Sequence, residues 1–168
     1  MEWDLSRTQY DEQGMKDYIL GSAEVVGLMS LRIFCNGDDV LYQKLKPSAM
    51  SLGSAFQKVN FLRDLKADFS MGRVYFPNIS LNEINEKSKK EIIDSIKSDF
   101  DHALIGIKGL PKKARFGVYV AYVYYLALFK KIINTPSDVI LESRVRIRNR
   151  HKFRLLAISY VKHQFNLI

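Results

Sequence analysis

A stripe of polar residues at helical spacing, set in apolar sequence, constrains the fold of this chain most strongly. Gln57, Asn60, Asp64 and Asp68 follow one another at intervals of three, four and four residues, which places them on one face of a helix. The stripe is surrounded by apolar side chains: Phe56, Val59, Phe61, Leu62 and Leu65. Because an unpaired polar group is costly to bury, the stripe must face water, a partner or a ligand cavity.

Helical spacing of apolar residues also dominates the rest of the chain, and strand patterns are weak. We expect essentially no sheet and five or six helices, covering residues 18–34, 40–68, 80–107, 116–133 and 153–165. The second helix is expected to bend near Pro47, and the third to begin with Ser80 and Glu83 as a capping box. Breaks are expected at the turn 36–39, at Pro77, at Pro111 and at 135–137.

The composition is that of one globular domain, with 168 residues of which 47% are hydrophobic and 26% charged. No run of 18 apolar residues occurs, so no membrane-spanning helix is expected. The first ten residues carry Glu2 and Asp4 and lack an apolar segment, so no signal peptide is expected. A single cysteine, Cys35, excludes an internal disulfide and favours a reducing, cytoplasmic setting.

The net charge of +8 is concentrated at the C-terminal end. Residues 141–168 hold seven of the 26 Lys and Arg residues and one of the 18 acids, so the first 140 residues are nearly balanced. In one interpretation this basic segment is a solvated loop. It is followed by a helix packed on the core through Leu155, Leu156, Ile158, Val161 and Phe165. Alternatively, the segment holds diphosphate or lies on the anionic inner face of a membrane. Nucleic acid is not an expected partner, since no DNA- or RNA-binding motif is present.

Asp64 and Asp68 are like charges one helical turn apart, which is mildly unfavourable on a bare helix. A divalent cation would reverse that sign. Magnesium in proteins is usually held by one or two carboxylates together with phosphate oxygens of a substrate, and Asn60 would add an amide oxygen. An ordinary solvated helix face is the alternative for this pair taken alone, so the longer pattern decides between them.

The pattern Gln57-x-x-Asn60-x-x-Arg63-Asp64-x-x-x-Asp68, with residues 72–77 after it, closely resembles the second signature of the phytoene and squalene synthase family. Upstream, Tyr18 opens a segment rich in small residues that ends at Gly27 and resembles the family's first signature. Downstream, Tyr125 and the element Glu142-Ser143-Arg144-Val145 are similar to the family's late tyrosine and Arg-Val element. The resemblance is greatest to the bacterial phytoene synthases and covers nearly the whole chain.

The resemblance implies an all-α, isoprenoid synthase fold, here partial, with about five or six helices around a prenyl cavity. Residues 1–168 would be the C-terminal part of a single domain. The family's earlier aspartate-rich motif is expected upstream of the first signature, and Asp11 and Asp17 do not have its spacing. We therefore expect this chain to be inactive alone and prone to self-association through exposed apolar surface.

The resemblance also implies roles for individual residues. Magnesium would be bound by Asn60, Asp64 and Asp68, and catalysis would involve Asp64, Asp68, Gln57 and Tyr18. Arg63 would orient the carboxylates or contact diphosphate, or else form a plain surface ion pair, and Arg144 would contact diphosphate. Other residues would line or close the cavity, with tight helix packing as the alternative for the first four: Tyr18, Ser22, Ala23, Gly27, Arg73, Tyr75 and Tyr125. Aromatic rings that would stabilise carbocations, or simply pack in the core, are Phe56, Phe61, Tyr18, Tyr122, Tyr124 and Tyr125.

The activity implied is a magnesium-dependent, head-to-head condensation of two geranylgeranyl diphosphates to phytoene through a cyclopropyl diphosphate. One alternative is squalene or dehydrosqualene synthesis from farnesyl diphosphate, with NADPH in the squalene case. The absence of a G-x-G-x-x-G fingerprint favours phytoene. A second alternative is a non-catalytic assembly or binding protein of the same fold, against which the intact Asn60, Asp64 and Asp68 argue.

Overall fold

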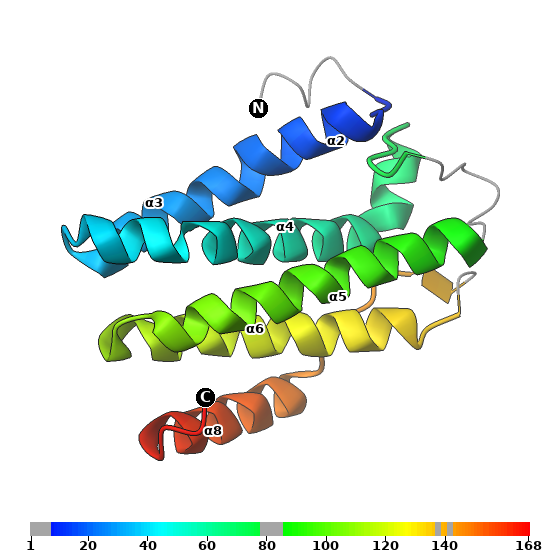
Figure 1. Cartoon of the computed structure of the whole chain (residues 1–168). Helices are drawn as coiled ribbons and strands as arrows, with labels where there is room; N and C mark the ends of the chain where they lie inside the picture. The colour runs from blue at the N-terminus through cyan, green and yellow to red at the C-terminus, as the bar shows by residue number, and fades with distance from the viewer. Residues whose placement is uncertain (1–7, 78–85, 137–138, 141–142) are drawn as a thin grey trace.

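The computed structural model is a bundle of helices and describes residues 8–77, 86–136, 139–140 and 143–168 (Figure 1). Within these ranges the β-structure is limited to one isolated bridge between Gln9 and Val74. The expectation of an all-α fold is therefore confirmed. The elements in chain order are α2 (Glu12–Ile19), the π-helix η1 (Leu20–Glu24), α3 (Val25–Cys35), α4 (Asp39–Ser70), α5 (Glu86–Gly109), α6 (Lys112–Ile133) and α8 (Asn149–Gln164).

Helix α4 is the centre of the bundle. It packs against α2, η1 and α3 on one side and against α5 and α6 on the other, while α8 packs on α6 (Figure 1). Side chains of α4, α5 and α6 form the largest buried cluster, in which Val59, Ile96, Phe100, Phe129 and Ile132 are at most 2% exposed. These contacts place the polar stripe of α4 between two apolar layers.

Short-range signals set the ends of the first helices. Asp11 caps α2 by accepting a 2.7 Å hydrogen bond from the backbone N–H of Gly14, and Asp38 caps α4 through the N–H of Leu41 at 2.9 Å. Between them, α3 ends where Asn36 and Gly37 adopt positive φ angles of 47° and 88°. This left-handed turn reverses the chain and lays α3 against α4.

The first helical segment differs from the expected regular helix over residues 18–34. It begins at Glu12 and contains five residues of π-helix, Leu20–Glu24. Within this stretch the Ser22 hydroxyl donates a 2.6 Å hydrogen bond to the Tyr18 carbonyl, a local bond that competes with regular helix geometry. Apolar spacing does not distinguish a π-turn from an α-turn, which explains why the sequence pattern missed it.

The other helix boundaries follow the sequence more closely. Helix α4 continues through Pro47 to Ser70, α5 is described from Glu86, and α8 begins four residues earlier than expected. The proposed cap of Ser80 with Glu83 lies outside the described residues.

Two helical segments are long and apolar enough, by length and composition alone, to cross a membrane: Glu12–Cys35 and Lys112–Ile133. This criterion does not test whether either segment spans a membrane, so the expectation of no membrane-spanning helix stays a prediction. The core helices of soluble proteins meet the same criterion, and both segments contribute residues to an internal cavity of the bundle. Lining that cavity and packing on neighbouring helices account for part of this apolar composition, whereas Met29 and Ile33 of the first segment are exposed.

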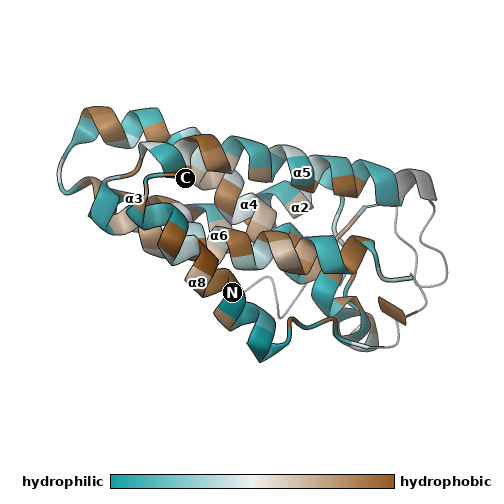
Figure 2. Ribbon diagram, turned by 90° about the horizontal axis from the view of Figure 1, so that it is seen from below, coloured by the Kyte–Doolittle hydropathy of each residue, from teal (hydrophilic) through white to brown (hydrophobic). Residues whose placement is uncertain are grey.

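The C-terminal helix packs on α6, but not through the expected apolar stripe. Ser159 is the buried residue of α8, whereas Ile158, Val161 and Phe165 are exposed. Contact with α6 is made by the Tyr160 and His163 rings against Phe116 and by a hydrogen bond from the Tyr124 hydroxyl to the Lys152 carbonyl. Figure 2 shows hydrophobic and hydrophilic residues intermixed along this helix.

Close approach between η1 and α4 depends on Gly53, and we predict that Gly53→Ala destabilises the fold. A Cβ atom at this position would lie 2.8 Å from the Ala23 carbonyl oxygen, a backbone atom that cannot rotate away. The expected loss in free energy of unfolding is about 1–3 kcal/mol, measured by urea denaturation.

Gly117→Ala is the matched control, because a Cβ atom at Gly117 would have no neighbour within 4 Å. In the interior of α6 this change should stabilise by about 0.5–1 kcal/mol. Equal effects of the two substitutions would contradict the assignment of Gly53 to the helix contact.

Candidate functional site

An apolar cavity of about 670 Å³ lies between η1 and α3 on one side and α4, α5 and α6 on the other. Its volume is in the range typical of ligand sites. Ser22, Ala23 and Gly27 contribute to one wall, as expected for the first signature. Gly27 also lies close to α4, since a Cβ there would be 3.0 Å from the Ala49 carbonyl oxygen. The cavity-wall and helix-packing interpretations of this glycine therefore both apply.

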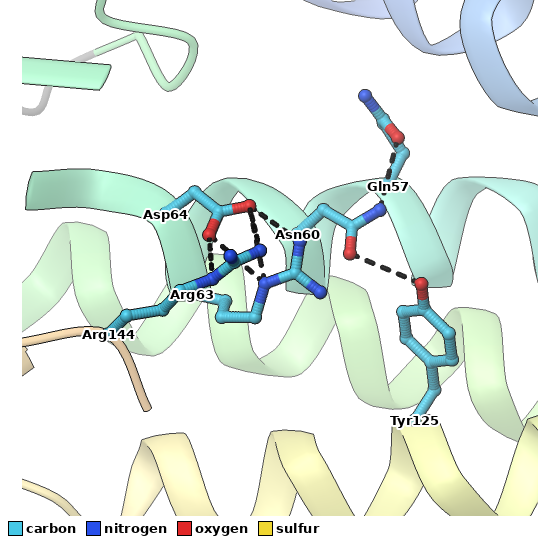
Figure 3. Close-up of polar contacts among 6 residues, drawn as sticks. All are labelled: Gln57, Asn60, Arg63, Asp64, Tyr125 and Arg144. Atoms are coloured by element: carbon cyan, nitrogen blue, oxygen red, sulfur yellow. Dashed lines mark hydrogen bonds and ion pairs between the residues drawn. The ribbon is translucent and has the colours of Figure 1, made fainter. Parts of the chain in front are cut away.

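One end of the cavity is polar. Asn60 joins the residues at this end (Figure 3), because its amide donates to Gln57 Oε1 at 3.5 Å and its Oδ1 accepts from the Tyr125 hydroxyl at 3.3 Å. The Phe56 ring stacks on Tyr125 with ring centroids 3.9 Å apart. All four side chains line the cavity. The polar stripe of α4 thus meets the aromatic surface of α6 at this point.

Phe34, Leu45 and Leu110 border the other end of the cavity, and Ser48 and Lys113 also belong to the lining. Leu45 and Asn60 both lie on α4, and fifteen residues of α-helix separate them by about 22 Å along the helix axis. The cavity is therefore an elongated, mostly apolar space with the Asn60 group at one end.

Asp64 lies one turn beyond Asn60 on α4 and is paired with two arginines (Figure 3). Arg63 Nη2 is 2.6 Å from Asp64 Oδ2, and Arg144 Nε is 2.7 Å from Asp64 Oδ1. The carboxylate of Asp64 raises the pKa of the Arg63 guanidinium through a side-chain hydrogen bond. Two segments far apart in the chain thus place positive charge beside the polar end of the cavity.

Asp68 lies one further turn along α4 and carries a perturbed carboxyl group. Partial burial, with repulsion from Asp64, raises the pKa of Asp68 to about 6, while Arg73 and Arg63 act in the opposite direction. Arg73 also borders the same small crevice as Asp68, and its N–H donates to the Asp68 carbonyl at 2.8 Å. The structure therefore brings Arg73 to the end of the stripe.

Tyr18, which was expected in the cavity wall, lies elsewhere, whereas Tyr75, which was expected to close the site, borders a crevice together with Asp68 and Arg73. Both are buried in an aromatic cluster and are not among the residues that line the described cavity. Tyr75 stacks on Phe61 at 4.2 Å between ring centroids and lies 5.0 Å from Tyr18. Phe61 joins this cluster to α4, so these rings pack against the helix that carries the polar stripe. The catalytic role of Tyr18 stays a prediction.

The other aromatic candidates separate into two groups. Phe56 and Tyr125 line the cavity, whereas Tyr122 is buried against Phe100 in the core. Tyr124 points to α8 through its bond to Lys152. Sequence spacing alone does not assign these rings, because every face of α6 is apolar or aromatic.

The stripe residues have the chemistry of a magnesium site. Asn60, Asp64 and Asp68 offer amide and carboxylate oxygens, the ligands that magnesium prefers. Partial burial next to Asp64 disfavours the charged form of Asp68, and a bound cation would relieve that penalty. Among the described residues no group of three or more His, Cys, Asp or Glu lies together. Two carboxylates would leave coordination positions for phosphate oxygens of a substrate.

The sequence pattern missed several residues that form the cavity. Leu52, Ser48, Gly106 and Ala121 line it, yet they are ordinary helix residues and carry no motif. Gly106 has a packing reason, because a Cβ there would lie 2.3 Å from Ser48 Cβ. Glu142, the first residue of the late element, lies outside the described residues.

Comparisons with known proteins agree with this geometry. Residues 1–151 match the model of the family described as squalene/phytoene synthase. The 15-cis-phytoene synthase of Synechocystis is 26% identical, with 96% of this chain and 55% of that protein covered. The phytoene synthase of Cereibacter sphaeroides is 27% identical, with coverages of 95% and 48%. The 4,4'-diapophytoene synthase of Staphylococcus haemolyticus is 37% identical over a segment that covers 48% of this chain and 27% of that protein.

Among solved structures, squalene synthase HpnC from Alicyclobacillus acidocaldarius matches with a TM-score of 0.67 at 21% identity, covering 79% of this chain and 55% of that chain. This match confirms the expected isoprenoid synthase fold. The two phytoene synthases match nearly all of this chain, but the chain spans only about half of their length. On the family match and the shared fold, the chain belongs to the squalene/phytoene synthase family.

Proposed function

We propose that this chain supplies the second diphosphate-binding motif and much of the prenyl cavity for the head-to-head condensation of two geranylgeranyl diphosphates to phytoene. The observation that carries the proposal is the continuity of the site along α4. Two carboxylates, Asp64 and Asp68, lead through Asn60 and Gln57 into a cavity lined by apolar side chains. A diphosphate at one end and a prenyl chain in the cavity match this order of groups.

The span of α4 along the cavity is long enough for a C20 substrate. The main chain of a geranylgeranyl group, about sixteen carbons, would extend about 19 Å at roughly 1.2 Å per bond. This length is close to the distance of about 22 Å between Asn60 and Leu45 along α4. The C15 farnesyl group would extend only about 14 Å on the same basis.

In this proposal the polar residues act on the diphosphates and the cavity acts on the hydrocarbon. Magnesium held by Asn60, Asp64 and Asp68 would supply positive charge for the departing diphosphate. Arg63 and Arg144 add guanidinium groups that suit phosphate oxygens. Departure of one diphosphate, carbon–carbon bond formation and loss of a proton give the cyclopropyl diphosphate. Departure of the second diphosphate, rearrangement and loss of another proton give phytoene.

The cavity contributes to both steps by excluding water from the carbocations. Tyr125, stacked on Phe56, places an aromatic face at the polar end, where positive charge develops on carbon. The Tyr125 hydroxyl and the Asn60 and Gln57 amides are connected there by hydrogen bonds. These groups would orient the reacting carbons.

This chain matches about half of its relatives' length. We further propose that turnover also requires a counterpart of the other half. Several apolar residues of α3 are exposed, among them Val26, Met29 and Ile33 at 55%, 65% and 75%. Such a surface calls for a covering element and would otherwise favour self-association. We therefore propose that this chain alone is inactive and self-associates. We also propose, as a separate point, that it acts in the cytoplasm.

The outward face of α8 supports a proposal of peripheral membrane contact. Exposed basic and apolar residues lie there in two rows: Arg150, Arg154 and Ile158 at spacings of four, and Phe153, Val161 and Phe165 at spacings of eight and four. We call these six residues the α8 surface. Apolar side chains between arginines suit an anionic lipid surface, in which both kinds of group find partners.

The test of the reaction is an assay with radiolabelled geranylgeranyl and farnesyl diphosphate, magnesium, and NADPH present or absent. We expect phytoene only from a form extended upstream in frame, and loss of about 100-fold or more in rate with Asp64→Ala or Asp68→Ala. Asp94→Ala, which removes an exposed carboxylate of α5, is the control and should retain activity.

The alternatives have distinct outcomes in that assay. Squalene from farnesyl diphosphate and NADPH would replace the phytoene proposal with squalene synthesis, and dehydrosqualene would do so without NADPH. Failure of the extended form to bind or convert either substrate would favour a non-catalytic protein of this fold.

The perturbed Asp68 generates a prediction about pH. Its raised pKa means that the folded chain holds the proton more tightly than the unfolded chain. The stability from this group is therefore present at low pH and is lost as pH rises through about 6. Asp68→Asn should raise the melting midpoint of the metal-free chain by about 2 °C at pH 8, with no gain at pH 4.

Thermal scans by circular dichroism at the two pH values measure this difference, with Asp94→Asn as the matched control. Addition of magnesium and inorganic pyrophosphate should stabilise the wild-type chain and not Asp68→Asn, since ligands that bind the native state raise its stability. A pH-independent effect of Asp68→Asn would contradict the burial of a charged Asp68.

Membrane contact is tested by co-sedimentation with vesicles. Binding to vesicles that contain phosphatidylglycerol should exceed binding to neutral phosphatidylcholine and should weaken with salt. Phe153→Ser, at a side chain 71% exposed, should reduce binding about ten-fold. Ile105→Ser, which removes an equally exposed apolar residue from α5, is the control, and equal loss in both variants would contradict the role of the α8 surface.

A further inference from the structure

We propose that Arg144 is a metal-responsive positioning residue: it holds Asp64 in the metal-free protein and moves to the diphosphate when a divalent cation takes Asp64. The proposal rests on the proposed diphosphate site and adds an order of events to it. It concerns the chain's own side chains, whose arrangement is on view in Figure 3.

The carboxylate of Asp64 is fully engaged by arginine in this structure. Arg144 reaches both of its oxygens, with Nε at 2.7 Å from Oδ1 and Nη2 at 3.4 Å from Oδ2. Arg63 donates from Nη2 to Oδ2 at 2.6 Å and from Nε to both oxygens at 3.1 and 3.2 Å. A magnesium ion needs the same oxygen lone pairs. It can therefore bind Asp64 well only if at least one guanidinium withdraws.

Arg144 is the guanidinium that is placed to withdraw. Arg63 is the adjacent residue on α4, its side chain is 22% exposed, and its charge also interacts with the Tyr125 hydroxyl. The Arg144 side chain is 50% exposed and comes from a segment 80 residues away in the chain. In the described part of the chain, the hydrogen bonds of its side chain go to Asp64 alone.

The backbone that follows Arg144 is anchored, so the side chain can move without this part of the segment. Val145 is buried in the core, and the Arg146 carbonyl accepts a 2.8 Å hydrogen bond from Lys131 Nζ on α6. Release of the side chain would leave the guanidinium beside the polar end of the cavity. A planar guanidinium there is suited to bind a diphosphate through two hydrogen bonds.

The exchange couples the two ligands. Without diphosphate, a cation must displace Arg144, and no new contact of the guanidinium offsets the free energy of the lost ion pair. With diphosphate, the released guanidinium gains a new partner, so each ligand raises the affinity for the other. Arg144 thus disfavours metal binding in the absence of substrate and favours it when substrate is present.

The experiment measures binding of Mn²⁺, a paramagnetic substitute for magnesium, by electron paramagnetic resonance of the whole chain. Arg144→Ala should bind Mn²⁺ alone about five-fold more tightly than wild type, the factor that corresponds to a partly exposed ion pair. Arg146→Ala is the matched control. It removes the same charge from an exposed residue two positions along the same segment, and its Mn²⁺ affinity should stay within about two-fold of wild type.

Inorganic pyrophosphate supplies the second arm. It should tighten Mn²⁺ binding to wild type and to Arg146→Ala, and should do so much less in Arg144→Ala. In parallel, the side-chain Nε–H resonance of Arg144, identified by its loss in Arg144→Ala, should shift when Mg²⁺ and pyrophosphate are added together.

Several results would overturn the proposal. These are equal or weaker Mn²⁺ binding in Arg144→Ala, equal tightening in both arginine variants, absence of Mn²⁺ binding in every variant, or an unmoved Arg144 resonance. None of these readouts depends on turnover. A failed condensation assay with the expected Mn²⁺ pattern would therefore reject the proposed reaction and leave the arginine exchange standing.

Discussion

The packing of α4 against helices on both of its sides is the constraint on which the rest of the structure depends. Gly53 lets the π-helical turn at Ala23 approach α4, and Gly106 lets α5 approach it at Ser48. Between these contacts the neighbouring helices stay far enough apart to leave an elongated cavity. Because the polar stripe lies on this central helix, its side chains are partly removed from water, and each must find a partner within the bundle.

The partners of the stripe show how its polar groups are satisfied within the bundle. Asn60 is satisfied by Gln57 and Tyr125, and Asp64 by two arginines. Asp68 is partly buried beside Asp64, and its pKa is raised to about 6 although Arg73 and Arg63 act in the opposite direction. The folded bundle therefore disfavours the charged form of this carboxyl group.

Much of the fold was predictable, because apolar spacing and capping residues act over a few residues. The helices around Asp64 and Phe129 follow from such local patterns, and the signature residues led to Asn60 and Asp68. The π-turn at Leu20–Glu24 was missed because apolar spacing is the same for both helix types. Tyr18 was expected in the cavity wall but lies in the cluster with Tyr75 and Phe61, since residue type alone does not tell which neighbour a tyrosine contacts.

The amino-acid sequence by itself determined the helical class, the family and the line of polar residues on one helix face, because each is a matter of residue type at short spacing. Only the tertiary structure decided that Arg144 meets Asp64 across 80 residues of chain, that α8 leaves Phe153 and Phe165 exposed, and that the cavity ends at Leu45. These features depend on how helices pack in space. Packing depends on the shapes of many side chains together, so no local sequence pattern predicts it.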